Sequence, residues 1–378
     1  MPCLNEAETV GTCVRKARAF LERAAIAGEV LVADNGSTDG SVTLAQQAGA
    51  RVVSVERKGY GSALRAGLDA ARGRFVIMAD SDDSHDIPRL DAFVDGLRAG
   101  NTLVIGNRFR GGIRRGSMSW LHRYLGNPLL SFVGRLFFSS PVGDFHCGLR
   151  GVERAAALRL GLCAPGMEFA SELIVKATLA GWRIVEVPTV VFPAGRSRAP
   201  HLRSWRDGWR HLRFLLMMSP RWLMLYPGAC LITAGAAAEL LILHGPVVIH
   251  GVGFDIHTML YAAGATVLGV QLVLFSLVAR SIGVLKNLLP MTPWLARFQR
   301  IFTLERGILL GLTLGAAGLA FAVYSVSLAA AHLGAIDPVR MMRVIIPSVT
   351  LILTGAEVVF ASFLLGFIDV RAGGAGDS

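Results

Sequence analysis

Charged residues are scarce in this chain. They make up 17% of its 378 residues, while hydrophobic residues make up 53%. Soluble proteins typically have about 25% charged residues. The deficit is therefore atypical of a purely soluble protein and points to segments embedded in a membrane. The length leaves room for two or three domains of roughly 150 residues each.

Cysteine is also scarce, and several familiar patterns are missing. The five cysteines are scattered and form no CxxC pair, so neither a disulfide framework nor a zinc site is predicted. The N-terminus lacks the basic flank and apolar core of a signal peptide. The net charge is +11, but the sequence contains no zinc finger, RNA-binding signature or basic heptad region. Because the basic residues cluster beside apolar segments, we predict membrane lipids as their partner and no nucleic acid.

Residues 1–215 alternate short apolar runs with helical patterns, which predicts an α/β domain with a mostly parallel sheet. The expected strands are 29–33, 51–55, 74–78, 103–106 and 183–187. The chain opens on Pro2-Cys3-Leu4-Asn5-Glu6, where a first strand should already be ending. We therefore expect that a first strand is missing and that the natural start lies upstream.

Residues 216–378 form a second, apolar domain. Four of its segments are each long enough to cross a hydrocarbon core of about 30 Å. They are residues 223–243, 259–279, 309–330 and 345–368. The second link between them is rich in Lys and Arg and the first has neither, so the positive-inside rule predicts a multi-pass cell-membrane protein with a cytoplasmic N-terminal domain. Arg340 and Arg343 lie in the third link, on the side that this rule disfavours.

Other residues of this region fit a membrane setting. Two stretches that mix Trp, Arg and Leu, 203–214 and 285–302, resemble interfacial helices, with ordinary juxtamembrane charge as the alternative. Glu239 and Glu357 fall inside apolar segments, where a charge costs about 3 kcal/mol. We expect these two to face protein, in helix packing or in a homo-oligomer, rather than a conduction path.

An acidic motif follows the 74–78 strand directly. Asp80, Ser81 and Asp82 lie where open α/β sheets bind ligands, at the carboxyl end of a strand. In an extended chain Asp80 and Asp82 project to the same side while Asp83 turns away. Clustered carboxylates usually hold a cation, and oxygen ligands favour Mg2+ or Mn2+ on a diphosphate. Taken alone, the motif is equally typical of a solvated loop or a helix cap.

Two glycine-containing turns precede the acidic motif. Asp34 and Gly36 open the first, where an Asp either contacts a base or ribose or caps the turn. Lys58 and Gly61 belong to the second, which lacks the third glycine of a dinucleotide fingerprint. This pattern excludes a Rossmann dehydrogenase and leaves a turn that approaches a nucleotide.

Taken in order, Pro2-Cys3-Leu4-Asn5-Glu6, Asp34-Asn35-Gly36-Ser37-Thr38-Asp39 and Asp80-Ser81-Asp82-Asp83 resemble the signatures of family-2 glycosyltransferases. Gly106-Asn107-Arg108-Phe109 and Glu186-Val187-Pro188 resemble the dolichol-phosphate mannose synthase branch. The membrane region is similar to that of bacterial polyprenyl-phosphate glycosyltransferases. This resemblance implies a GT-A (nucleotide-diphospho-sugar transferase) fold, a nucleotide-sugar donor and Mg2+ or Mn2+.

The resemblance also implies site residues. The donor contacts would come from Pro2, Asn5, Glu6, Asp34, Gly36, Lys58, Gly61, Asp80, Ser81 and Asp82. Asp80 and Asp82 would be the metal ligands, and we favour Asp82 as the main one. Arg108 and Arg123 match phosphate-binding arginines. The Gln-x-x-Arg-Trp signature of processive synthases is missing, which favours transfer of a single sugar.

We therefore predict transfer of one sugar to a polyprenyl (dolichyl- or undecaprenyl-type) phosphate, with inversion. A lipid phosphate is already an anionic nucleophile, so the reaction needs positioning and charge neutralisation rather than a strong base. The expected catalytic residues are Asp82, Arg108, Arg123 and Asp144.

Several alternatives stay open at this point. Asp144 and Arg150 form either an acceptor-side pair or a buried ion pair, and Glu168 and Glu172 either contact the sugar or are structural. A lipid hydroxyl as acceptor would need a base, for which Glu168 or Asp144 is the candidate. A transporter or flippase with a degenerate transferase domain is the rival class. Four basic residues contact either substrate phosphates or lipid headgroups: Arg196, Arg198, His201 and Arg203.

Overall fold

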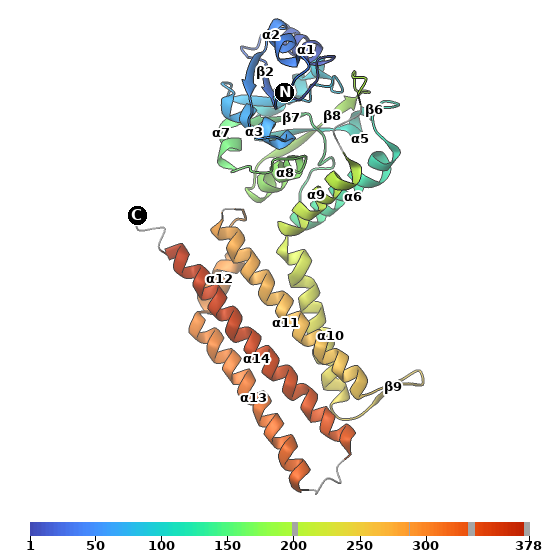
Figure 1. The fold of residues 1–378 in the computed structure, drawn as a ribbon, viewed down its shortest axis with the longest axis vertical. Helices are drawn as coiled ribbons and strands as arrows, with labels where there is room; N and C mark the ends of the chain where they lie inside the picture. Colours follow the sequence, from blue (N-terminus) through green and yellow to red (C-terminus); the bar gives the residue numbers. More distant parts are fainter. Residues whose placement is uncertain (199–202, 287, 332–336, 374–378) are drawn as a thin grey trace. The chain divides into compact units, whose positions relative to one another are not determined.

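The computed structural model describes the whole chain except residues 199–202, 287, 332–336 and 374–378. The chain divides into two compact units, Met1–Leu215 and Leu216–Ser378. Strands and helices alternate in the first unit, and long helices dominate the second (Figure 1).

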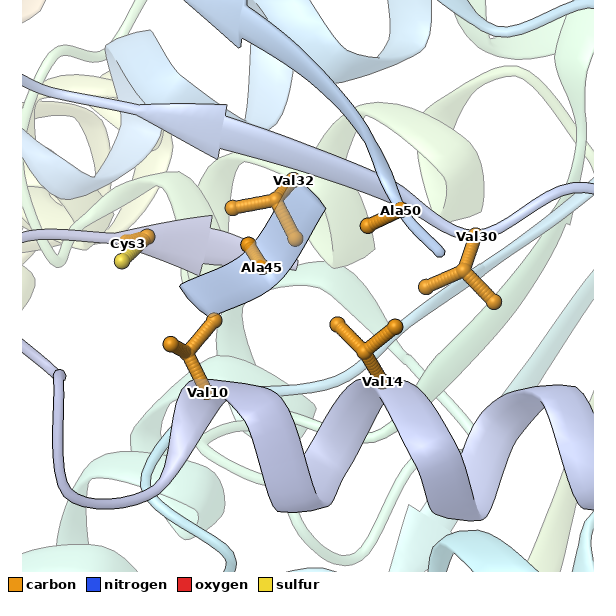
Figure 2. Packing of buried hydrophobic residues seen from close by; sticks show 7 residues of the cluster. All are labelled: Cys3, Val10, Val14, Val30, Val32, Ala45 and Ala50. Carbon is orange, nitrogen blue, oxygen red and sulfur yellow. The ribbon is translucent and has the colours of Figure 1, made fainter. Parts of the chain in front are cut away.

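Three parallel strands form the first sheet of the N-terminal unit, in the order β1-β2-β3. The elements are β1 (Pro2–Cys3), α1 (Val10–Arg23), β2 (Leu31–Asp34), α2 (Ser41–Gln47) and β3 (Arg51–Ser54). Val10 and Val14 lie one turn apart on α1 and pack against Val30 and Val32 and against Ala45 of α2 (Figure 2). This packing buries the face of α1 that carries residues i and i+4, and it fixes the carboxyl ends of β1 and β2 side by side.

A second sheet has five strands in the order β4-β7-β5-β8-β6. The strands are β4 (Phe75–Met78), β5 (Leu103–Asn107), β6 (Gly112–Ile113), β7 (Arg150–Glu153) and β8 (Ile184–Val191). β5 is buried along its whole length and pairs parallel with β8, whereas β7 runs antiparallel to both β4 and β5. The mostly parallel α/β domain is confirmed, with β7 as the antiparallel exception that the sequence did not reveal.

The helices of this unit connect and cover the strands. They are α3 (Tyr60–Ala70), η1 (Ile87–Arg89), α4 (Asp91–Arg98), α5 (Arg108–Gly111), η2 (His122–Gly126), α6 (Asn127–Phe138), α7 (Arg154–Arg159), α8 (Phe169–Leu179) and α9 (Ser204–Met217). An apolar cavity of about 490 Å³ is lined by residues of β2 and β4 together with α1, α3 and α4. β1 pairs with β2 and β4 pairs with β7, so the strands form two sheets in place of one continuous sheet.

The second unit contains four helices long and apolar enough to cross a membrane, namely Arg221–Ile242, Ile256–Leu285, Leu304–Leu328 and Pro338–Ile368. Its elements are η3 (Arg221–Leu225), α10 (Tyr226–Ile242), β9 (Val247–Ile249), β10 (Val252–Phe254), α11 (Ile256–Leu285), α12 (Pro293–Ile301), α13 (Leu304–Ala331) and α14 (Pro338–Gly373). The four predicted apolar helices are confirmed.

Glycines allow these helices to approach closely. A Cβ atom on Gly228 of α10 would lie 2.8 Å from the carbonyl oxygen of Gly269 on α11, and one on Gly311 of α13 would lie 2.5 Å from that of Gly355 on α14. Small residues at such contacts are typical of membrane helices, whose association depends on close packing rather than on exclusion of water.

Two charged residues of this unit have partners within it. Glu239 accepts hydrogen bonds from Thr266 (2.9 Å) and Thr350 (3.2 Å), which joins α10, α11 and α14. The prediction that Glu239 faces protein is therefore confirmed. Arg343 pairs with Asp255 at 2.6 Å, so its positive charge in the third link is balanced.

Candidate active site

The acidic loop after β4 is tied to the segment after β1. Ser81 Oγ donates to the carbonyl oxygen of Pro2 at 2.6 Å, and Thr9 Oγ1 donates to the carbonyl oxygen of Ser81 at 2.7 Å. Ser81 is buried. Pro2 and Ser81 were predicted to contact the donor. In the structure, the Ser81 hydroxyl and the Pro2 carbonyl bind each other and so hold the end of β1 against the loop after β4.

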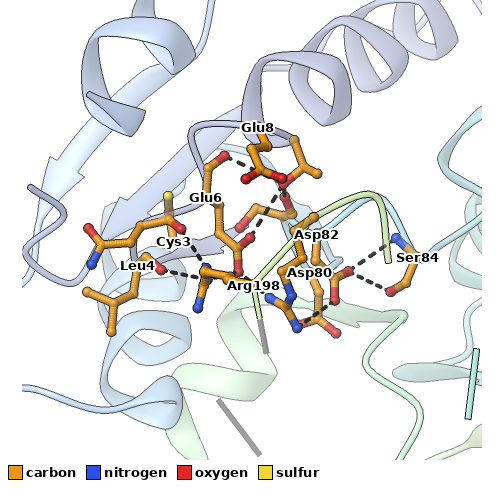
Figure 3. Close-up of polar contacts among 12 residues, drawn as sticks. Cys3, Leu4, Glu6, Glu8, Asp80, Asp82, Ser84 and Arg198 are labelled. Carbon is orange, nitrogen blue, oxygen red and sulfur yellow. Dashed lines mark hydrogen bonds and ion pairs between the residues drawn. The ribbon is translucent and has the colours of Figure 1, made fainter. Parts of the chain in front are cut away.

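Acidic and basic side chains alternate just beyond these strand ends (Figure 3). Arg196 pairs with Glu6 and also with Asp82, whose Oδ2 lies 3.3 Å from Arg196 Nη2. Arg198 Nη2 lies 2.5 Å from Glu6 Oε1, and Arg198 Nε donates to the carbonyl oxygen of Asn5 at 2.9 Å. Burial raises the pKa of Glu6, although both arginines act in the opposite direction. The structure thus places Asn5, Glu6 and Asp82 around two guanidinium groups.

The neighbouring aspartates have separate partners. Asp80 accepts a hydrogen bond from Tyr60 Oη at 2.9 Å, and its other oxygen lies 3.0 Å from His85 Nε2. Burial acts to raise the pKa of Asp80, but the bonds from His85 and Tyr60 outweigh it and the pKa lies below its usual value. Asp83 turns away, as predicted, and pairs with Lys16 at 2.6 Å.

The donor chemistry of the site fits a hard divalent cation held partly by substrate. Mg2+ typically binds one or two carboxylates and completes its shell with phosphate and water. In the described residues no cluster of three or more His, Cys, Asp or Glu side chains would cage an ion. Asp82 Oδ2 faces the cationic Arg196, so positive charge is already accommodated there. Both aspartates have partners on both oxygens: Tyr60 and His85 hold Asp80, and Ser84 and Arg196 hold Asp82. Of the two, Asp82 is the one that faces an arginine, and for this reason we favour it as the ligand.

The two glycine-containing turns are locked to each other. Asp34 accepts hydrogen bonds from the backbone N–H groups of Gly36 (3.0 Å) and Ser37 (3.1 Å), so it caps its own turn. Lys58 Nζ donates to the carbonyl oxygen of Asn35 at 2.6 Å. Gly36 has φ +92°, and a Cβ atom there would lie 2.0 Å from Lys58 Nζ. The positive φ favours glycine at this position, and a larger residue would also displace the end of the Lys58 side chain.

Gly61 is packed against a different segment. Its N–H donates to the carbonyl oxygen of Pro165 at 2.9 Å, and a Cβ atom would lie 2.2 Å from the carbonyl oxygen of Ala164. Gly61 thus brings the turn against residues 164–165, and its N–H group is used within the protein.

Arg108 and Asp144, both predicted as catalytic, are bound to each other. Arg108 Nε and Nη2 each donate to the Asp144 carboxylate at 2.7 Å, a bidentate pair in which Asp144 is fully buried. Burial lowers the pKa of Arg108, but the Asp144 carboxylate more than offsets this, so the pKa is raised. The paired carboxylate leaves Asp144 little capacity as a base.

The possible pairing of Asp144 with Arg150 is wrong. Arg150 donates instead to the backbone carbonyl oxygens of Cys147 (2.7 Å), Ala170 (2.7 Å) and Phe145 (2.8 Å). Three carbonyl acceptors satisfy the buried guanidinium without a carboxylate. Arg150 therefore holds the loop before β7 in place, and Asp144 forms its ion pair with Arg108.

The remaining predicted residues differ in how many contacts they make within the protein. Arg123, on η2, lies over the ring of Tyr124 with 5.3 Å between its guanidinium carbon and the ring centre. Glu172 is fully buried, pairs with Lys176 at 2.9 Å and accepts from the N–H of Ala164, so it is structural. Glu168 has one buried oxygen with no hydrogen-bond partner. His201 lies outside the described residues.

Three functional neighbours were not predicted from the sequence. Tyr60 and His85 hold Asp80, and buried Glu186 accepts from the N–H groups of Gly143 (2.7 Å) and Asp144 (3.0 Å). His85 stands five residues after Asp80 within the acidic motif, which was a usable signal. Glu186 belongs to the Glu186-Val187-Pro188 motif that carries the family resemblance, and Tyr60 lies in the turn between Lys58 and Gly61, but neither motif indicated which residue each side chain contacts.

Comparisons with known proteins identify the family of the chain. Residues 1–161 match the family model of glycosyl transferase family 2, and residues 277–369 match that of the glycosyltransferase family 2 C-terminal transmembrane region. The chain is 35% identical over 375 residues to the low-salt glycan biosynthesis hexosyltransferase Agl6 of Haloferax volcanii, covering 97% of this chain and 87% of that protein. It is 27% identical over 188 residues to a dolichyl-phosphate hexose transferase of the same organism, covering 50% of this chain and 79% of the relative.

One solved structure similar to the chain is glucosyl-3-phosphoglycerate synthase from Mycobacterium tuberculosis, in complex with Mn2+, uridine diphosphate and glucosyl-3-phosphoglycerate. It is 25% identical, has a TM-score of 0.44, and the match covers 57% of this chain and 75% of the other.

Fold and site together define an enzyme, a glycosyltransferase with a GT-A domain and a C-terminal membrane region. The chain belongs to glycosyltransferase family 2, as its similarity to the hexosyltransferase along nearly its full length shows. The rival interpretation as a transporter with a degenerate transferase domain is thereby set aside.

Proposed function

We propose that this membrane protein transfers a single sugar from a nucleotide-sugar donor to a polyprenyl phosphate, with a divalent metal and with inversion at the anomeric carbon. The proposal is supported chiefly by one observation: the same chain contains the Glu6–Arg196–Asp82 cluster and four apolar helices long enough to cross a membrane. The name of one relative, a dolichyl-phosphate hexose transferase, supports a lipid phosphate as the acceptor.

Charge neutralisation is the main task of the donor side. The bond from the anomeric carbon to the diphosphate breaks, and the leaving group gains negative charge. Arg196 and Arg198 carry guanidinium groups suited to bidentate contact with phosphate, and Glu6 and Asp82 hold them in place before donor binds. Mg2+ or Mn2+ bound at Asp82 would act there as a Lewis acid on the diphosphate.

The acceptor side needs no strong base. A phosphate monoester is largely ionised near neutral pH and attacks as an oxyanion, forming the new bond to the anomeric carbon from the face opposite the leaving group. Arg108 is held rigid by Asp144, so its guanidinium is a fixed positive charge. Arg123 has no hydrogen bond from its guanidinium to a carboxylate in the described structure, and we assign it to the acceptor phosphate.

The orientation follows from charge. Arg and Lys residues concentrate in the link between α11 and α13, and positively charged links face the cytoplasm. We therefore place the catalytic unit at the cytoplasmic face of the cell membrane, where nucleotide sugars are available.

The test uses two adjacent aspartates with different roles. Asp82→Asn removes a charge from the donor cluster and should lower sugar transfer at least about 100-fold, the loss typical of a removed electrostatic contact. Asp83→Asn is the matched control, because Asp83 points to Lys16 instead, and should keep most of the activity. The rate of labelled sugar incorporation into lipid is measured in membranes at equal protein level. Full activity of Asp82→Asn would refute the donor-site assignment.

A second acceptor class has one observation in its favour. Glu168 has a buried carboxylate oxygen without a hydrogen-bond partner, and a lipid hydroxyl acceptor would require such a base. The chemical lability of the labelled product separates the two acceptors, because a sugar phosphate is far more acid-labile than an ordinary glycoside.

A further inference from the structure

The start of α10 and the end of α11 meet in a polar junction that the proposed reaction does not use. Gly228 faces Gly269 and Gly235 faces Ala262, so α10 and α11 run antiparallel. Ser276 Oγ on α11 also donates to the carbonyl oxygen of Pro220 at 3.2 Å. The junction is therefore at the end of the membrane unit where the chain enters from residue 215.

Arg280 is the central charge of this junction. It is only 8% exposed, its Nη2 donates to Thr292 Oγ1 at 3.1 Å, and its Nε is buried without a hydrogen-bond partner. Pro220, the residue before Arg221, is hydrogen-bonded to Ser276 one turn before Arg280, which brings Arg221 of η3 to the same junction. Among the described residues, Arg280 forms no ion pair with an acidic side chain. Two neighbouring cations without a counter-ion repel each other, and an anion between them removes that repulsion.

Two further groups of the junction have unused hydrogen-bonding capacity. Ser219 is 3% exposed, and its Oγ has no partner. Thr292 is the residue that precedes α12, yet its side chain accepts from Arg280 and does not cap the helix. The first N–H groups of α12 thus lack a side-chain cap, and uncapped helix N-termini favour anions.

Apolar surface continues from the junction along the helices. Phe275 and Ile282 on α11 and Leu223 on η3 are all at least 41% exposed. A free anion makes no use of such surface, whereas the hydrocarbon chain of a lipid packs against it.

We propose that this junction binds the phosphate group of a membrane lipid, with Arg280 and Arg221 as its charge partners and Ser219 as a hydrogen-bond donor. The site is built from the membrane unit alone and is distinct from the donor cluster. The inference does not rest on the proposed acceptor, because any membrane lipid that carries a phosphate ester meets its chemistry.

The experiment counts bound lipid on the purified full-length protein by native mass spectrometry, with farnesyl phosphate as the probe. We expect Arg280→Gln to bind one farnesyl phosphate fewer than the wild type, or to bind it about tenfold more weakly, the effect of losing one charge-assisted hydrogen bond. Arg221→Gln, which alters a less buried residue, should act in the same direction. Arg300→Gln is the matched control, since Arg300 is exposed on α12, and should match the wild type.

Three competitors identify the source of the phosphate. Farnesol should not occupy the site, because it lacks the phosphate. Displacement by phosphatidylglycerol would show that phospholipid headgroups use the site, which supports the proposal. Wild-type stoichiometry and affinity in both Arg280→Gln and Arg221→Gln would overturn it. So would occupancy by farnesol, or by inorganic phosphate with the affinity of the lipid.

Discussion

Asp80 and Asp82 are two residues apart, yet their surroundings give them different roles. Asp80 is held by Tyr60 and His85, whereas Asp82 faces Arg196 and accepts from Ser84 Oγ at 2.6 Å. Asp80 is held by a phenol and an imidazole, whereas Asp82 faces a guanidinium group, whose positive charge a metal ion could replace. This contrast at the residue scale is why we assign metal and diphosphate contact chiefly to Asp82.

Buried histidines make the stability of the catalytic unit sensitive to pH. His211, on α9, is 5% exposed, lies 2.8 Å from Ser171 Oγ and packs edge-on against His146. Burial lowers the pKa of His211 from 6.5 to about 4. Its folded pKa is depressed, so its stabilising contribution is complete above pH 6.5 and is lost as the pH falls towards 4.

The corresponding experiment compares thermal unfolding at two pH values. Between pH 7.5 and pH 5.5 we expect His211 alone to reduce the free energy of unfolding by about 1 kcal/mol. His211→Asn removes the titrating ring, so its unfolding temperature should fall less between these pH values than that of the wild type. His257→Asn, which alters an exposed histidine, serves as the control. An unchanged pH dependence in His211→Asn would contradict the assignment.

At the scale of elements, the membrane unit depends on glycine contacts between helix pairs. A Cβ atom on Gly269 would lie 2.7 Å from the carbonyl oxygen of Gly228 and the backbone nitrogen of Ile232, whereas one on Gly264 of the same helix meets nothing within 4 Å. Overpacking a close contact of this kind typically costs about 1–3 kcal/mol.

These two glycines provide a matched pair of variants. Gly269→Val should push α10 and α11 apart and lower the unfolding temperature in detergent by several degrees, about what a 1–3 kcal/mol loss produces in a protein of this size. Gly264→Val introduces the same side chain into open space and should leave the temperature nearly unchanged. Equal unfolding temperatures for the two variants would show that the α10–α11 contact is not tight.

Elements were predictable from the sequence to unequal degrees. The apolar helices and the parallel strands follow from local patterns, because hydrophobic length and period determine them. β7 was not predicted because buried Arg150 makes its sequence look polar. The guanidinium group is satisfied by the carbonyl oxygens of Phe145, Cys147 and Ala170, and a sequence pattern does not reveal such contacts. Only part of the site was predictable as well. Motifs located Glu6, Asp34 and Asp82, but the pairing of each carboxylate with an arginine depends on contacts such as Arg196 with Glu6, which are 190 residues apart in the sequence.

At the scale of the whole molecule, one chain combines a nucleotide-sugar type of catalytic domain with its own membrane anchor. Four apolar helices far exceed what tethering requires, since one span suffices to hold a domain at a membrane. The proposed lipid substrate would account for the additional helices, because the hydrocarbon part of such a substrate stays in the bilayer. The chemical identity of the acceptor therefore decides whether the proposed function is right.

The most direct test incubates the purified protein with a panel of labelled nucleotide sugars and a polyprenyl phosphate, and then treats the labelled lipid with mild acid. The account predicts that one donor labels the lipid and that mild acid releases the label as free sugar, because the sugar is joined through a phosphate. A labelled lipid that survives mild acid would place the sugar on a hydroxyl and contradict the account, and so would the absence of labelled lipid with every donor.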